Sequence, residues 1–208
     1  MLELNSQTPK CKRVMCCRVT LVTVLTLTAF VAGCASSPPA RFYTLNAVSA
    51  PAAMTSNLSV SVGPVSVPAI VDRPQIVVST GANQVSLDDF NQWASPLQNN
   101  IARVVAENLA VMLGTPRVTL SSQALGADAA YRAAVDVQRF ESMPGEAAVL
   151  DAVWTVRRSQ DGLSQTGRTT LREASTEAGY AALAAAHSRA IARLSQDIAD
   201  ALRALDNR

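Results

Sequence analysis

The first 33 residues set the strongest limit on what this chain can fold into, because they have the pattern of a leader segment. Four basic residues lie between Lys10 and Arg18, and the 14 residues of 19–32 are uncharged and rich in Leu, Val and Thr. As a helix with a 1.5 Å rise, such a run spans about 21 Å, which is less than the roughly 30 Å hydrocarbon core of a bilayer. A cleaved secretory signal is therefore favoured over a transmembrane helix.

A cysteine directly follows this apolar run, in the sequence Val31-Ala32-Gly33-Cys34. A small residue before the cysteine, with an aliphatic residue three positions before it, resembles the lipobox of bacterial lipoproteins. The resemblance implies cleavage before Cys34, a diacylglycerol on its thiol and an acylated amine, with no other cofactor. Ala35 and Ser36 follow, without the Asp that would suggest retention in the inner membrane. By resemblance to enterobacterial sorting rules, the expected location is the periplasmic face of the outer membrane.

The part of the chain after residue 33 has the size and composition of one domain. Its 175 residues are enough to bury roughly 70% of the unfolded surface. Three of the four cysteines lie in the leader, so the remainder has only Cys34 and needs no disulfide to fold. The remainder also holds 14 arginines and 15 acidic residues, so the positive balance of the full chain belongs to the leader. Without a basic patch, nucleic-acid binding has no support.

We expect residues 34–57 to form a lipidated N-terminus and tether, and residues 58–208 to form the domain. Ser95 is expected to cap a helix that begins at Pro96, with residues 88–93 as a preceding turn. Gly63-Pro64 predicts a bulge or an edge in its strand. Apolar periodicity predicts strands over 41–45, 58–67, 75–79, 117–120, 131–140, 147–157 and 167–173, and helices over 96–113 and 176–205. This order predicts a mixed α/β domain whose sheet is covered by the two helices.

Two motifs connect this pattern to a known family. The first is Asp72-Arg73-Pro74-Gln75-Ile76-Val77, and about 16 residues later comes Trp93-Ala94-Ser95-Pro96-Leu97. With them, residues 135–141, 149–156 and 180–201 resemble the ABC-type transport auxiliary lipoproteins, the PqiC or YmbA-like proteins. The resemblance implies a three-layer α/β domain with a mixed sheet, similar to the anticodon-binding and TolB N-terminal domains. The chain departs from the family at 69–71, where an aromatic residue or Leu is common.

The resemblance also implies a function. Members are periplasmic lipoproteins, usually of the outer membrane, that work with envelope-bridging MCE-domain proteins in phospholipid transport or membrane integrity. The expected partners are therefore an MCE-domain protein and the membrane, and a homo-oligomeric ring is plausible because MCE proteins are rings. As partner-binding residues we predict Asp72, Arg73, Pro74, Gln75 and Trp93. In the alternative interpretation the first four set a turn and Trp93 packs in the core.

A catalytic function has weaker support. His187 is the only histidine, and it lies on the apolar stripe of the last predicted helix, which favours a packed side chain with one polar partner. The chain has no G-x-S-x-G motif, and Ser164 has the wrong spacing for one. One histidine and no free cysteine after Cys34 leave only carboxylates for a metal, and Asp88-Asp89 are more simply acids at a helix start.

The leading hypothesis is therefore a non-catalytic lipoprotein that docks an MCE-type transport assembly at the outer membrane. One alternative is a lipoprotein enzyme acting on envelope glycan or lipid, which would require a functional His187. Another is the substrate-binding lipoprotein of an importer, although two lobes fit poorly into 175 residues.

Overall fold

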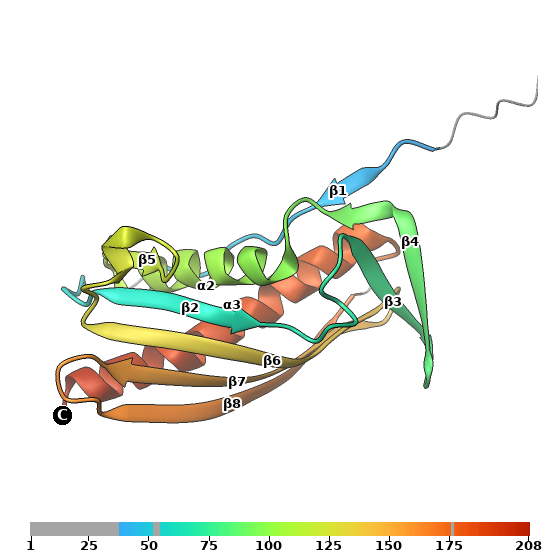
Figure 1. The fold of residues 1–208 in the computed structure, drawn as a ribbon. Coiled ribbons are helices and arrows are strands. Elements are labelled where there is room, and N and C mark those ends of the chain that lie inside the picture. The colour runs from blue at the N-terminus through green and yellow to red at the C-terminus, as the bar shows by residue number, and fades with distance from the viewer. Residues whose placement is uncertain (1–37, 52–54, 176) are drawn as a thin grey trace, which may run out of the picture. The chain divides into compact units, whose positions relative to one another are not determined.

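The computed structural model describes residues 38–51, 55–175 and 177–208. Cys34 and the leader lie outside the described residues. Within the unit Ala40–Arg208, the elements in chain order are β1 (Arg41–Tyr43), β2 (Val60–Ser66), β3 (Gln75–Gly81), β4 (Gln84–Trp93), α2 (Leu97–Leu113), β5 (Val118–Leu120), the short 3-10 helix η1 (Ala124–Gly126), β6 (Tyr131–Met143), β7 (Ala147–Arg158), β8 (Ser164–Ala174) and α3 (Tyr180–Asp206), as Figure 1 shows. Among these helices, none is long and apolar enough to cross a membrane.

Strand β6 is the central strand of one mixed eight-stranded sheet. It pairs antiparallel with β7, and β7 pairs antiparallel with β8. Strand β2 runs parallel to the first half of β6 and carries β5, while β3 meets β6 only near Ser142. Strand β4 then pairs with β3 and carries β1. The predicted bulge at Gly63-Pro64 is confirmed, because the β2–β6 register shifts between Val62 and Val65.

Both helices pack on the same face of this sheet and against each other. Helix α2 covers β2 and β5, whereas α3 covers β7 and β8 (Figure 1). On β7, the alternate residues Leu150, Ala152 and Val156 are fully buried, as the period-two pattern predicts. The predicted α/β class, mixed sheet and pair of long helices are confirmed. The three-layer arrangement stays a prediction.

Two local predictions ahead of α2 are wrong. Residues 88–93 belong to β4 and not to a turn, because 84–87 form a hairpin with β3 in which Val77 faces Leu87. The next pair is Gln75 with Gln92, so the intervening acidic residues bulge out of the ladder. The expected cap at Ser95 is also displaced: the helix starts at Leu97, and Pro96 stands at the N-cap without a side-chain bond.

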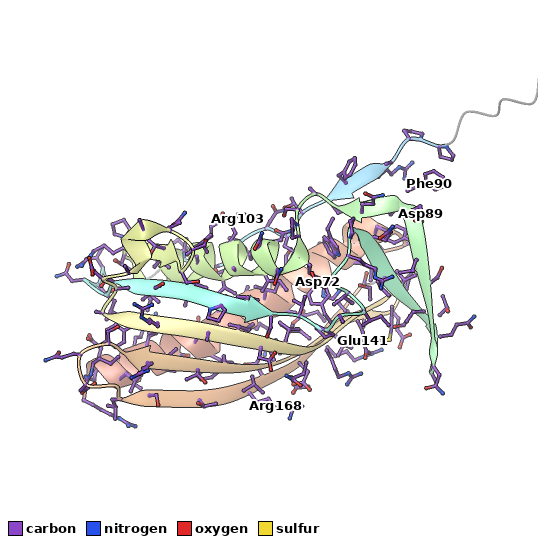
Figure 2. The ribbon with its side chains drawn as sticks, viewed as in Figure 1. Asp72, Asp89, Phe90, Arg103, Glu141 and Arg168 are labelled. Carbon is purple, nitrogen blue, oxygen red and sulfur yellow. The ribbon has the colours of Figure 1, made fainter. Side chains whose placement is uncertain are left out.

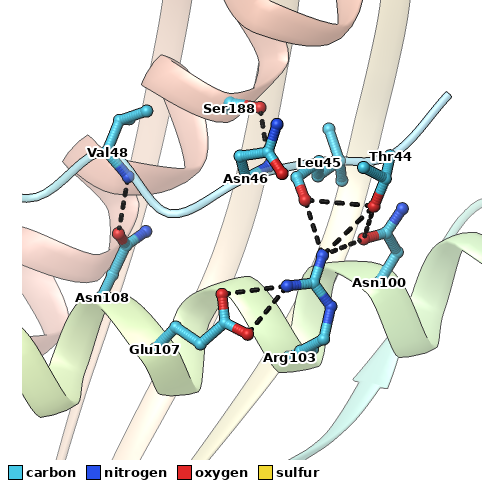
Figure 3. A network of polar contacts seen from close by, with 9 residues as sticks. All are labelled: Thr44, Leu45, Asn46, Val48, Asn100, Arg103, Glu107, Asn108 and Ser188. Atoms are coloured by element: carbon cyan, nitrogen blue, oxygen red, sulfur yellow. Dashed lines mark hydrogen bonds and ion pairs between the residues drawn. The ribbon is translucent and has the colours of Figure 1, made fainter.

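Residues 44–49, here called the N-terminal strap, join β1 to the two helices (Figure 3). The guanidinium of Arg103 on α2 donates from Nη2 to the carbonyl oxygen of Leu45 at 2.6 Å. The backbone N–H of Asn46 donates to Ser188 Oγ on α3 at 3.1 Å, and that of Val48 donates to Asn108 Oδ1 on α2 at 3.2 Å. Because the Leu45 side chain is fully buried, the strap is part of the folded unit.

Candidate functional site

The backbone brings the two motifs of the sequence together at one corner of the sheet. In the turn before β3, the N–H groups of Val71 and Asp72 both donate to the carbonyl oxygen of Pro68, at 3.0 and 3.2 Å. The N–H of Trp93, at the end of β4, then donates to the carbonyl oxygen of Pro74 at 2.7 Å. The 72–77 and 93–97 segments are therefore neighbours because β3 and β4 form an antiparallel pair.

Trp93 joins this corner to the core. It is 5% exposed, and its ring lies edge-on to Phe140 and His187, with centroid distances of 6.2 and 6.5 Å. The interpretation of Trp93 as a core aromatic is thus correct for most of its surface. Its remaining surface lines a cleft, so core packing and a partner contact are compatible at this residue.

The cleft has a volume of about 490 Å³ and is lined by both motifs. Asp72, Arg73 and Pro74 form one wall and are exposed, and residues 94–96 with Gln98 form much of the rest. Arg73 makes no ion pair with another described residue. A buried aromatic beside an exposed guanidinium and carboxylate offers apolar and charged contacts to a protein segment. Figure 2 labels Asp72 at this corner.

Gln75 is the predicted site residue that does not line this cleft. Its side-chain amide donates to Asp89 Oδ1 at 3.2 Å, so it supports the β3–β4 pair. The structure thus brings Asp72, Arg73, Pro74 and Trp93 together and places Gln75 beside them.

Sequence reasoning missed a second, larger hollow of about 700 Å³ beside the β3–β4 hairpin. Its apolar lining includes Ile70, Val77, Val85 and Met143. Ile70 is 50% exposed and lies in the stretch where the chain departs from the family pattern. The alternation that puts Val85 and Leu87 on one face of β4 is a signal for this strand, whereas the neighbouring Asp88-Asp89 favour a helix start.

His187 is a packed residue, as predicted. Its ring stacks on Phe140 with centroids 3.8 Å apart, and its Nε2 lies 2.9 Å from Ser142 Oγ. Burial lowers the pKa of His187 to about 3, so the ring is neutral at pH 7. Ser142 is 2% exposed and His187 is fully buried, so this pair has no opening to a substrate. No group of three or more residues suited to a metal occurs among the described residues.

The comparisons identify the family. The model of the ABC-type transport auxiliary lipoprotein component matches residues 43–199, which include both motifs and the cleft between them. The chain belongs to this family. As an auxiliary lipoprotein it is a membrane-anchored protein of the cell envelope, and its role is an auxiliary one in transport. No curated protein matches the chain.

Two crystal structures share the fold of this auxiliary lipoprotein. The structure of an uncharacterized protein aligns with a TM-score of 0.64 at 24% identity, over 78% of this chain and 98% of the other. Protein XCC0632 from Xanthomonas campestris, of family DUF330, aligns with a TM-score of 0.61 at 20% identity, over 80% of this chain and 98% of the other. At these identities the likeness supports the fold alone.

Proposed function

We propose that this auxiliary lipoprotein is a non-catalytic subunit of an MCE-type lipid-transport system. In this proposal, acyl chains on Cys34 hold it at the periplasmic face of the outer membrane, and the folded unit docks the envelope-bridging MCE protein there. A ring of several copies would match the ring symmetry of that partner. The convergence of residues 72–74 and 93–96, from the two motifs, on one cleft is the observation on which this role depends.

The chemistry of the cleft favours a protein partner. Arg73 presents a planar donor group with no ion-pair partner among the described residues, and Trp93 supplies a rigid aromatic surface. Arg and Trp are the residue types that most often dominate binding energy at protein interfaces. Asp72 beside Arg73 adds an acceptor, so a partner segment with one acidic and one basic residue would fit this wall.

The test is a pull-down from gently solubilised envelopes with tagged protein. We expect the wild type to recover an MCE-domain protein and Arg73→Glu to recover it at least about tenfold less, a loss of about 1.4 kcal/mol. The matched control is Arg193→Glu, because Arg193 is also exposed, lies on α3 and forms no ion pair with another described residue. Recovery with this control should equal that of the wild type.

A Cys34→Ala variant separates the surface contact from simple co-localisation. If the partner is still recovered, the domain surface makes the contact. If Arg73→Glu recovers as much MCE-domain protein as the wild type, the cleft is not part of the interface. Failure of the folded, lipidated wild type to recover any MCE-domain protein would contradict the docking role itself.

A further inference from the structure

Two exposed phenylalanines lie where the chain leaves the fold toward Cys34. Phe42 on β1 is 63% exposed, and Phe90 on β4 is 39% exposed. In the parallel β1–β4 pair Arg41 faces Asn91, so Phe90 lies next to the first residue of β1. Figure 2 shows Phe90 and Asp89 on β4 beside this strand. Burial of Phe42 or Phe90 against a second surface would remove substantial apolar area from water.

The bulge that presents Phe90 is held rigidly. Asp88 accepts hydrogen bonds from the backbone N–H of Phe90 at 2.8 Å, the side-chain amide of Asn91 at 2.7 Å and the hydroxyl of Tyr180 at 3.0 Å. These bonds, that of the Phe90 N–H first, lower the pKa of Asp88. Tyr43 donates to Asn91 at 2.7 Å and its ring packs against Tyr180. Asp88, which the sequence favours as an acid at a helix start, therefore holds the exposed Phe90 in place.

The length of the chain before β1 indicates what covers this pair. Phe42 is eight positions after Cys34, and an extended chain spans at most about 3.6 Å per residue, so the Cα atoms of the two residues lie within about 29 Å of each other. A tether of this length keeps the pair at high effective concentration near the bilayer. Aromatic side chains are favoured at the boundary between lipid headgroups and acyl chains.

The charges at this end favour a lipid surface without net negative charge. Around Phe90 in the β1–β4 pair lie one arginine, Arg41, and two acids, Asp88 and Asp89. They give no net attraction to anionic lipid, so the contact would depend on the aromatic rings. We propose that Phe42 and Phe90 insert into the zwitterionic phospholipid surface that carries the anchor and so fix the orientation of the folded unit on the membrane. This proposal rests on the lipid anchor at Cys34 in the proposed function.

The experiment uses the absence of any cysteine in the sequence after Cys34, whose own thiol is blocked by the lipid in this proposal. Lipidated protein carrying Phe42→Cys or Phe90→Cys is labelled with an environment-sensitive fluorophore and reconstituted into phosphatidylethanolamine–phosphatidylcholine vesicles that contain nitroxide-labelled lipid. The matched control is Leu163→Cys, because Leu163 is 36% exposed and lies in the β7–β8 turn, at the end of the sheet away from β1 (Figure 1). We expect quenching at positions 42 and 90 to be at least about twofold stronger than at 163.

The same samples distinguish the ways in which the proposal can fail. Equal quenching at all three positions, with acyl chains present in the intact mass, would overturn the membrane contact and leave the anchor intact. An intact mass without acyl chains would overturn the anchor and with it the membrane contact. Protection of positions 42 and 90 only when an envelope protein is added would assign the pair to a protein interface and contradict the proposal.

Discussion

His187 is a titratable side chain held neutral inside the core. Its ring lies between α3 and β6, stacked on Phe140, and Ser142 is its polar partner. Nδ1 has no hydrogen-bond partner among the described residues, so protonation would add a buried charge without a compensating group. The periodicity of the last helix was enough to predict burial of this residue. Its partners could not be predicted, because they lie more than forty residues away in the sequence.

The first prediction concerns the pH dependence of stability. The pKa of His187 is about 3 in the folded chain and about 6.5 when unfolded, so the unfolded chain binds the proton more readily. The resulting stability is fully present above pH 6.5 and is lost as the pH falls toward 3. Between pH 7 and pH 5, the free energy of unfolding of the wild type should fall by about 2 kcal/mol more than that of His187→Gln. Urea unfolding at both pH values measures this, and equal losses would contradict it.

Among the elements, the β7–β8 pair shows how one small residue permits close packing. Trp154 on β7 faces Gly167 on β8, and an added Cβ at Gly167 would overlap the indole ring. The indole N–H donates to Thr169 Oγ1 at 3.0 Å, which fixes the ring over the glycine. The sequence predicted both strands from their alternation and turns, but the contact between Trp154 and Gly167 depends on a register that the pattern did not specify.

A substitution at this contact should be costly. Gly167→Ala should lower the free energy of unfolding by about 1–3 kcal/mol, because the indole ring must leave its position. Gly81→Ala in β3 is the matched control, since the nearest atom to its added Cβ is 3.8 Å away. Its effect should stay within about 0.5 kcal/mol. The urea midpoints of unfolding of the two variants measure this difference. Equal midpoints would mean that the Trp154 ring moves aside at little cost in free energy.

At the scale of the whole molecule, the feature that the sequence could not predict is which strands pair when they lie far apart in the chain. The sequence predicts one sheet that includes β2 and β3, and this is confirmed. Each of the two strands, however, pairs with β6 and not with the other, which local periodicity does not reveal. The corner could be predicted in part because its residues lie in two compact motifs. The contacts of the N-terminal strap could not be predicted, because in the sequence Arg103 and Asn108 are only two of the polar positions on a helix.

The strap gives a third stability prediction. Arg103→Ala removes the donor to the Leu45 carbonyl and its ion pair with Glu107, so the strap should open more often. Hydrogen exchange at the amides of Asn46 and Val48 should then be at least about tenfold faster, which corresponds to about 1.4 kcal/mol of local stability. Arg139→Ala is the control, because Arg139 forms a comparable exposed ion pair with Glu141 and does not touch the strap. Unchanged exchange in Arg103→Ala would show that the other strap bonds suffice.

The strap also determines how mechanical tension on the N-terminus enters the fold. Tension applied at residue 40 is first resisted by the three residue pairs between β1 and β4. It is then resisted by the hydrogen bonds that join the strap to α2 and α3. These helices rest on different strands, α2 on β2 and β5 and α3 on β7 and β8. The load is therefore divided between the strands on either side of β6, so that tension applied at residue 40 acts on the domain as one body.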